Sequence, residues 1–291
     1  MEELTTKQTK NLRSHQLAIL EILKEFDRVC KKLDIPYVLF AGTLLGAVRH
    51  GGFVPWDDDV DILMHRRHYE RFLKEAESVL DTERFYLQKE FSEHWPMFFS
   101  KLRLNNTACI EKFHPKDPKI HQGIYMDIFP CDNALNSPIG RTCQFLASKV
   151  VVAKSLDRRG YDTNSFTKRI FLTLCRLLPL KPFLRLTKAG KDDGPLVHNF
   201  LGGAHSFAKS VYARKLFKNP VEARFEDGMY PIPGGYEQLL RILYDDYMEI
   251  PCPEERKIKQ HAVLVDTENS YEQYLDYRDG MKFDVYTRSI R

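Results

Sequence analysis

The sequence lacks several features that would assign it to a large class of proteins. None of its six cysteines, at positions 30, 109, 131, 143, 175 and 252, belongs to a CxxC pair, so spacing gives no local support for a thiolate zinc knuckle. Reduced thiols in a cytosolic protein are the simplest interpretation. Charge of one sign is not in large excess, because 44 Lys and Arg against 40 Asp and Glu leave a net charge of +4. So mild a balance does not indicate a nucleic-acid partner.

Long uncharged hydrophobic runs are also missing. A membrane-spanning helix needs ~20 mostly apolar residues, and the longest apolar concentration, residues 166–186, contains five basic residues and two prolines. The first thirty residues are polar and charged, which does not fit a signal peptide. We therefore expect a cytoplasmic protein, with a peripheral position at the inner face of the membrane as the further option.

What is present is an ordinary globular composition, with 43% hydrophobic and 29% charged residues in 291. Apolar residues recur at helical spacing from Ile19 to Leu33, which predicts an amphipathic first helix. Buried strands are predicted at Tyr37–Ala41 and Val60–Met64, and a charged helix from about residue 67 to 80. Further strand-like runs follow at Phe85–Lys89, Phe98–Leu104, Ala108–Phe113 and Ile124–Phe129. The pattern is that of an α/β (α+β) protein.

Two aspartates at the beginning of the second predicted strand, one just before it and one inside it, indicate a metal site. Asp59 and Asp61 are two positions apart, so on a strand their side chains share one face. Carboxylates held together repel unless a cation lies between them, and oxygen ligands suit Mg²⁺ or Mn²⁺. Asp57 precedes them, and it either contributes to the site or caps the loop.

The segment before these acids has the character of a phosphate-binding turn. Gly42 and Thr43 follow a predicted strand and open a short helix, where backbone N–H groups and the helix N-terminus favour an anion. Arg49 lies between the two elements, and we expect it either to neutralise phosphate charge or to pair with one of the aspartates. A phosphate turn followed by a metal strand predicts transfer of a phosphorus-centred group from a nucleotide-activated donor.

A third carboxylate is predicted to complete the site. Asp127 is a lone acid in an otherwise apolar strand, and a buried unpaired carboxylate is costly unless it finds a cation, a donor or a proton. We therefore place it beside Asp59 and Asp61. Lys101, in another predicted strand, either offsets phosphate charge or is an exposed strand residue.

These residues resemble the LicD family, choline-phosphate transferases with the nucleotidyltransferase fold, to which fukutin and fukutin-related protein are related. The resemblance rests on Gly-Thr-Leu-Leu-Gly-Ala-Val-Arg-His followed by Pro-Trp-Asp-Asp-Asp-Val-Asp, on Lys-Leu-Arg at 101–103, and on residues 123–130. A weaker match lies in residues 225–253. The resemblance implies a mixed β-sheet flanked by helices, with the Gly-Thr turn near the nucleotide phosphates, Asp59 and Asp61 as metal ligands, and Asp127 as third ligand or base.

The same resemblance implies a CDP-alcohol donor such as CDP-choline and a glycan hydroxyl as acceptor, with CMP released. The glycan would be a cell-surface polysaccharide, a lipopolysaccharide or a teichoic acid, and it could be lipid-linked. Two alternatives stay open. One is a nucleotidyltransferase that releases pyrophosphate, and the other is a non-catalytic relative that binds a glycan or nucleotide.

The middle of the chain differs in charge from the rest. Residues 141–190 contain eleven Lys or Arg and two acids, a net charge of +9. We predict a catalytic core at 1–134, a basic helical insertion at 135–200 and a C-terminal section completing the core at 201–291. The basic helices either are solvated with apolar faces packed on the core, or form a platform for an anionic, membrane-linked acceptor.

Overall fold

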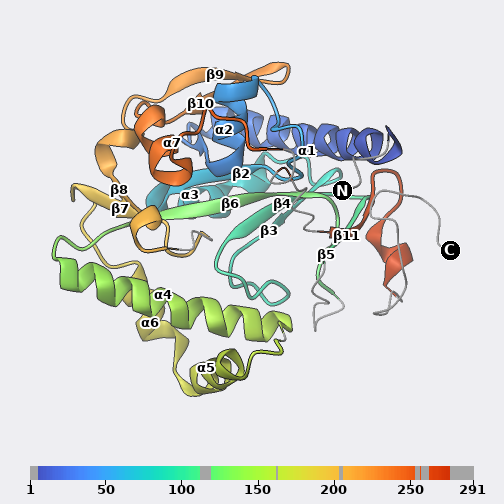
Figure 1. Ribbon diagram of the computed structural model, residues 1–291. Coiled ribbons are helices and arrows are strands. Elements are labelled where there is room, and N and C mark those ends of the chain that lie inside the picture. Colours follow the sequence, from blue (N-terminus) through green and yellow to red (C-terminus); the bar gives the residue numbers. More distant parts are fainter. Residues whose placement is uncertain are drawn as a thin grey trace.

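A mixed β-sheet forms the centre of the computed structural model, which describes residues 6–111, 119–161, 163–202, 206–252, 256 and 262–275 (Figure 1). The strand order is β1-β2-β6-β4-β3, and the end of β6 also pairs with β7, which pairs with β8. β2 and β6 run parallel, whereas every other neighbouring pair in this sheet is antiparallel. The fold is therefore α+β with a mixed sheet, as predicted. The strands are β1 (Val38–Leu39), β2 (Asp61–His65), β3 (Phe85–Gln88), β4 (Ser100–Leu104), β6 (Tyr125–Asn133), β7 (Leu196–His198) and β8 (Val211–Ala213).

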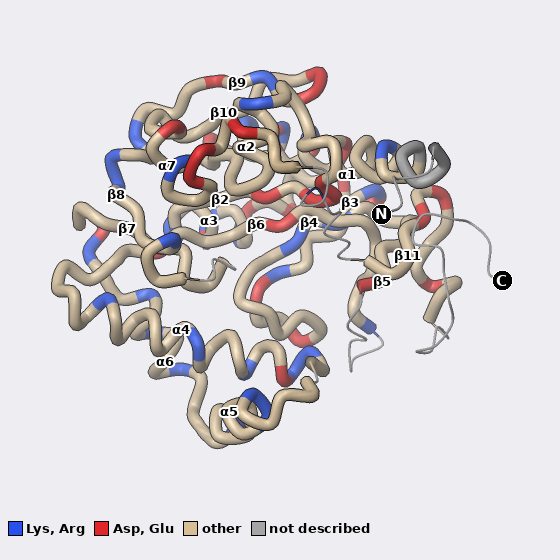
Figure 2. Tube along the Cα trace, in the orientation of Figure 1, with Lys and Arg blue, Asp and Glu red and all other residues tan. Residues whose placement is uncertain are grey.

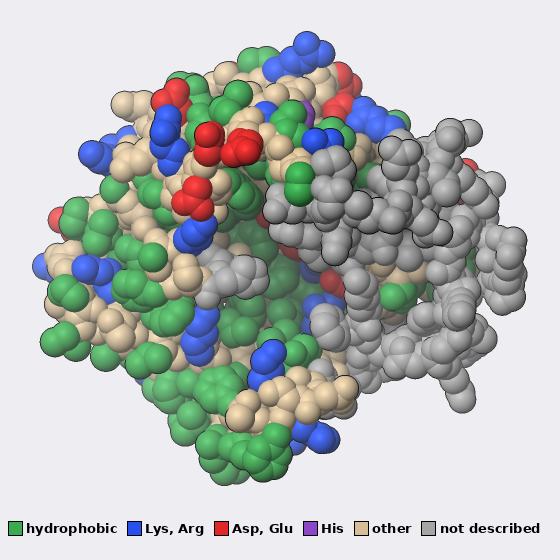
Figure 3. Space-filling view, viewed as in Figure 1, with side chains coloured by type: hydrophobic (Ala, Val, Ile, Leu, Met, Phe, Trp, Pro, Cys, Tyr) green, Lys and Arg blue, Asp and Glu red, His purple; other side chains and the backbone are tan. Residues whose placement is uncertain are grey.

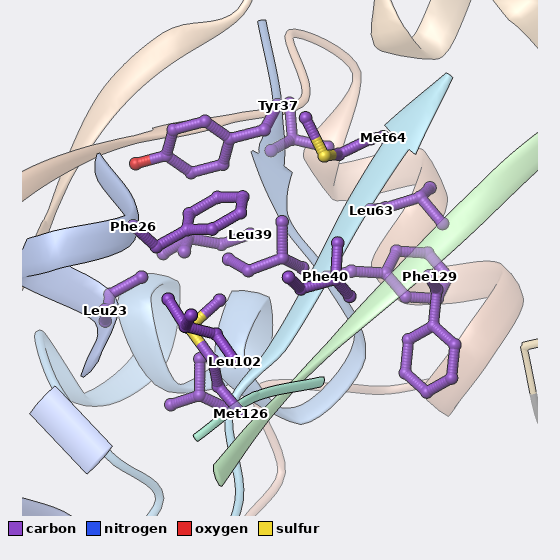
Figure 4. Close-up of a cluster of buried hydrophobic side chains, with 14 of the residues drawn as sticks. Leu23, Phe26, Tyr37, Leu39, Phe40, Leu63, Met64, Leu102, Met126 and Phe129 are labelled. Carbon is purple, nitrogen blue, oxygen red and sulfur yellow. The ribbon is translucent and has the colours of Figure 1, made fainter. Parts of the chain in front are cut away.

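The long first helix covers this sheet with its apolar face. α1 (Thr6–Leu33) contacts β4 and β6, and its predicted apolar positions are buried, among them Leu23 and Phe26 at 0% exposure. Figure 4 shows these two side chains directed at the apolar residues of the sheet, including Leu102 of β4 and Met126 of β6. Burial of such side chains stabilises a fold by about 1.5–3 kcal/mol each, which explains why helical periodicity located α1 correctly.

Two elements of the first half of the chain are shorter than predicted, and a third is described only in part. The strand predicted at Tyr37–Ala41 contains only Val38 and Leu39, because Ala41 adopts a φ of +46° and opens α2 (Ala41–His50). α3 (Arg66–Glu75) ends earlier than predicted and continues into a 3₁₀ turn at Ala76–Ser78. The strand predicted at Ala108–Phe113 is β5 (Ala108–Glu111), and residues 112 and 113 lie outside the described residues.

The C-terminal section packs against the beginning of the chain. β9 (Val221–Phe225) and β10 (Gly228–Ile232) form a hairpin that contacts α2 and β1, and α7 (Tyr236–Tyr244) also contacts α2. Tyr230 in β10 is buried at 3% exposure, which indicates a structural role. β11 (Ala262–Asp266) pairs with β5. Short 3₁₀ turns lie at Ala208–Ser210, Arg214–Phe217 and Tyr271–Tyr274.

Three helices form the basic middle segment, at the bottom of Figure 1. They are α4 (Pro138–Arg159), α5 (Phe166–Leu177) and α6 (Leu180–Thr187). Side chains of α4 and α6, such as Val151 and Phe183, belong to or pack against the main hydrophobic cluster, whereas no α5 residue does among those described. β7 also lies within the predicted 135–200 segment, and it extends the central sheet. No helix in the described part of the chain combines the length and apolar character needed to cross a bilayer.

Candidate active site

The parallel pairing of β2 with β6 brings two sequence-distant aspartates together. Asp61, the first residue of β2, is the register partner of Asp127 on β6, and partners on adjacent strands project from the same face of a sheet. The two carboxylates are 66 positions apart along the chain but lie side by side in space. The structure thus brings Asp127 beside the start of β2, as the lone acid in an apolar strand predicted.

Electrostatics shows that Asp61 lies in a group of acids. Burial raises the pKa of the Asp61 carboxyl well above its usual range, and the nearby charges of Asp59, Asp127 and Asp57 raise it further. Like charges so placed disfavour one another's ionised forms unless a cation intervenes. The predicted acids therefore converge, and Asp57 belongs with them.

The prediction that Asp59 and Asp61 share one face of a strand is wrong. Asp59 does not lie on the strand, because β2 begins at Asp61; the two-residue β1 pairs only with Ile62 and Leu63 and does not extend the ladder back to it. Asp59 lies instead in the loop, where carboxylate oxygens of Asp57, Asp58 and Asp59 are all within 4.8 Å of one another. The loop, rather than a shared strand face, supplies most of the local negative charge (Figure 2).

Gly42 and Thr43, in the first turn of α2, lie next to these acids. A Cβ at Gly42 would lie 2.5 Å from Asp57 Oδ2, so only glycine permits the carboxylate to approach the first turn of α2 so closely. The Thr43 hydroxyl accepts a hydrogen bond from the Asp61 backbone N–H at 2.8 Å, which fixes the start of β2. Both residues therefore position the acids, and their contact with donor phosphates stays a prediction.

Lys101 is the cation that the buried Asp127 requires. Its side chain is 2% exposed, and its Nζ lies 2.9 Å from Asp127 Oδ1 and 3.7 Å from the Glu111 carboxylate. The ammonium also lies 3.1 Å from the centroid of the Tyr125 ring. Burial lowers the pKa of Lys101, and Asp127 and Glu111 act in the opposite direction. The alternative of an exposed strand residue is wrong for Lys101.

Comparison with known proteins agrees with this geometry. Residues 34–132, which contain the Gly-Thr turn, the acidic loop, Lys101 and Asp127, match the family described as LicD/FKTN/FKRP, nucleotidyltransferase domain. Residues 34–132 therefore form a domain of the LicD family. The resemblance to this family and the fold class predicted from the sequence are both confirmed.

Individual relatives cover different parts of this chain. A Haemophilus influenzae protein named lipopolysaccharide cholinephosphotransferase LicD is 29% identical over 261 residues, which are 84% of this chain and 94% of the relative. Uncharacterized proteins of Rickettsia prowazekii and Rickettsia typhi are 37% and 38% identical over 82 and 66 residues. Those shorter matches cover 26% and 22% of this chain, and 31% and 21% of the respective relatives.

A buried charge network extends from the site of this LicD-family domain to the helical segment. Glu111 of β5 accepts a hydrogen bond from the Tyr125 hydroxyl and forms an ion pair with Arg159 at the end of α4. Burial would raise the pKa of Glu111, but Lys101, Arg159 and Arg103 outweigh it and lower the pKa to about 2. The order Arg159–Glu111–Lys101–Asp127 alternates charge and connects α4 with the acids.

Sequence reasoning missed Glu111 and Arg159. Arg49 Nη1 donates to the backbone carbonyls of Tyr247 and Glu249 at 2.8 and 3.0 Å, so it holds the C-terminal section, and it forms no ion pair with an aspartate of the described part of the chain. Its contact with phosphate stays a prediction. Tyr244 of α7 was also missed: burial raises the pKa of its phenol, as do Asp61, Asp57 and Asp59, so it lies within electrostatic range of the acids. No local pattern in the sequence signals these long-range partners.

Proposed function

We propose that this protein is a transferase that moves an alcohol phosphate, with phosphocholine as the model case, from a CDP-activated donor to a glycan hydroxyl. The observation that carries the proposal is the convergence of Asp61 and Asp127 across parallel strands, with Asp57 and Asp59 in the adjoining loop. The Haemophilus influenzae relative, which matches most of both chains, is named as a lipopolysaccharide cholinephosphotransferase.

The acidic residues fit a divalent cation such as Mg²⁺ or Mn²⁺. They offer only carboxylate oxygens, the donor type that these ions prefer, and the neighbouring acids add to the effect of burial in raising the pKa of Asp61. Asp59, Asp61 and Asp127 would hold the ion, with Asp57 beside them. When bound, such an ion neutralises charge on the donor diphosphate and polarises the phosphorus-oxygen bonds.

The chain's own residues would orient the reactants. The first turn of α2 places backbone N–H groups next to the acids, where a helix N-terminus favours phosphate oxygens. Thr43 holds the start of β2 through its hydrogen bond to Asp61, and Lys101 compensates the charge of Asp127. With Asp127 fixed beside Asp61, either it or a neighbouring carboxylate can accept the proton of the attacking hydroxyl while CMP leaves. Positioning and charge compensation supply most of the rate in this class of reaction.

The acceptor is proposed to be a glycan of the cell surface, in a lipopolysaccharide or teichoic acid, carried on a lipid. The face of the molecule shown in Figure 3 is hollowed between α4 and α5 below and the sheet above, and hydrophobic side chains line much of the hollow. Such a shape suits an acceptor with an apolar portion. A cytoplasmic position at the inner face of the membrane belongs to the same proposal.

The first experiment identifies the donor. The protein is incubated with Mg²⁺, a lipopolysaccharide or teichoic acid acceptor, and either CDP-choline, CDP-ribitol or CDP-glycerol, and the nucleotide products are separated. Release of CMP with transfer of the alcohol phosphate to the glycan supports the proposal. With CTP and an alcohol phosphate in place of the CDP-alcohol, release of pyrophosphate would instead indicate a nucleotidyltransferase, and no turnover in either assay would favour a non-catalytic binding module.

The second experiment identifies the metal ligands. Asp59→Asn is expected to abolish transfer and to weaken Mn²⁺ binding in isothermal titration, while Asp227→Asn, at an exposed position paired with Lys24, leaves both unchanged. Asp58→Asn tests whether the ion is held by the loop acids, because Asp58 belongs to the group of Asp57, Asp58 and Asp59 but is not among the predicted ligands. If Asp58→Asn weakens Mn²⁺ binding as strongly as Asp59→Asn does, the ion is held by the loop and the assignment of Asp61 and Asp127 as ligands is wrong.

A further inference from the structure

Helix α5 presents a hydrophobic stripe to the outside of the molecule. Leu177 is 82% exposed, Phe166 76% and Leu174 58%. The spacing Phe166, Ile170 and Leu174 repeats every four residues and places these side chains along one side of the helix, and Leu178 follows directly after its end. The stripe consists of Phe166, Ile170, Phe171, Leu174, Leu177 and Leu178. Single exposed hydrophobic residues are normal, but six on one short segment mark an interaction surface.

The orientation of α5 is determined by its inner side. Cys175 is buried at 2% exposure, and Lys154 of α4 donates to the backbone carbonyls of Cys175 and Arg176, each at 3.0 Å. These bonds reach carbonyl groups in the last turn of α5, where the helix supplies no further i+4 N–H donor, and the Cys175 carbonyl also accepts from the Leu178 N–H at 3.2 Å. Since the buried side of α5 lies on α4, the stripe faces away from the core.

The neighbouring helices bury most of their apolar residues, although Ile139 and Leu146 of α4 are exposed singly at 78% and 59%. In α6, Leu180, Phe183 and Leu184 pack against the main hydrophobic cluster, as do Val152 and Leu156 of α4. The interpretation of the basic segment as solvated helices with apolar faces on the core therefore holds for α4 and α6. It is wrong for α5, whose apolar residues are left at the surface.

The charges around the stripe have one sign. Lys168, Arg169 and Arg176 lie on α5, and Lys181 and Arg185 follow on α6. The two acids between residues 141 and 190 are Asp157 and Asp162, and Asp157 already forms an ion pair with Arg176. Figure 3 shows the hydrophobic side chains gathered at the lower edge of the molecule with basic side chains close by. Two copies of so basic a surface would repel each other, which disfavours a second copy as the occupant.

We propose that α5 and its turn into α6 dock on an anionic lipid bilayer, with the stripe buried at the boundary between headgroups and acyl chains. Apolar side chains flanked by Lys and Arg are the composition of helices that lie in this interface, where burial and charge attraction add together. This surface is separate from the acidic site, and its function does not require that the proposed transfer reaction be correct.

The experiment measures co-sedimentation of the full chain with vesicles, in the absence of donor and acceptor. Vesicles of phosphatidylcholine mixed with phosphatidylglycerol are compared with vesicles of phosphatidylcholine alone. Strong binding to the mixed vesicles, weakened by salt, is expected. The double variant Leu174→Asp, Leu177→Asp is expected to bind at least about tenfold more weakly, because two apolar contacts with the bilayer are replaced by charge.

Two further variants keep the proposal open to refutation. Met229→Asp, at a 52% exposed position on the β10 hairpin, is the matched control and is expected to bind as the unaltered protein does. The double variant Lys168→Gln, Arg169→Gln leaves every hydrophobic residue of the stripe in place and should weaken binding to the mixed vesicles. It tests the proposal independently if the aspartate variant fails to fold. No binding at low salt, unchanged binding of both double variants, or a concentration-dependent dimer in ultracentrifugation that the Leu174 and Leu177 changes dissolve would overturn the proposal.

Discussion

Lysine has opposite surroundings in two regions of this molecule. Lys101 in the sheet is 2% exposed and lies between two carboxylates, whereas Lys168 on α5 is exposed to solvent. Removing one partner of a buried ion pair leaves an uncompensated charge, which costs far more than the loss of a surface charge. The buried cation is therefore part of the scaffold of the acidic site, and the exposed one is available to a partner.

The largest expected effect is on activity, at the acidic site that contains Asp61. Asp61→Asn removes a ligand of the proposed cation and should lower transfer by a factor on the order of 10²–10³. The same change should leave stability equal or higher, because the pKa of Asp61 is raised by burial and by its acidic neighbours. CMP release and a urea unfolding curve measure the two effects. Activity near that of the unaltered protein would contradict the role given to Asp61.

The next effect concerns stability and tests the contrast between the two lysines directly. Lys101→Met leaves Asp127 and Glu111 without their shared cation, and we expect a loss of about 3–5 kcal/mol in the free energy of unfolding. Lys168→Met should leave the urea midpoint unchanged. If Asp127→Asn, added to Lys101→Met, restores a large part of the stability, the loss arises from the uncompensated carboxylate. Equal effects of the two lysine variants would remove the distinction.

A third test uses the pH dependence of stability. The folded-state pKa of Glu111 is about 2, below its ordinary value of 4.5, so its contribution is fully present above the higher value and is lost as the pH falls toward the lower one. A shift of this size corresponds to about 3 kcal/mol. Glu111→Gln should therefore flatten the fall in stability between about pH 5 and pH 2. Parallel curves for the two proteins would show that Glu111 is not held ionised by its cations.

The smallest effect is expected at the contact between the helical segment and the sheet. Arg159 of α4 pairs with Glu111 and lies over the Trp95 ring at 5.0 Å from its centroid. Arg159→Gln should lower the free energy of unfolding by about 1–3 kcal/mol, since a charge-assisted contact is lost while Lys101 still compensates Glu111. Lys168→Gln provides the exposed counterpart. A loss at Arg159 as large as that at Lys101 would mean that α4 is the main support of the network.

Much of the acidic site was predictable because its residues break a pattern. A lone acid at position 127 in an apolar strand required a cation, and the cation proved to be Lys101. Arg49 broke no such pattern, and its partners are the backbone carbonyls of Tyr247 and Glu249, some 200 positions away. Glu111, at the end of its strand, also broke no pattern that would have indicated its role. Where the partner is a distant backbone group or a charge on another element, local spacing contains no signal.

The order of elements from α1 to β6, the helical character of the basic segment and the grouping of acids at 57–61 follow from the sequence alone, because periodicity and turn residues act over short distances. Tertiary structure decided which apolar stripe is covered: Phe26 of α1 is 0% exposed, whereas Leu177 of α5 is 82% exposed. It also decided which charges are buried, since β4, β5 and β6 enclose Lys101 with its carboxylates. Burial depends on what packs across an element, and those neighbours come from parts of the chain that no local pattern connects.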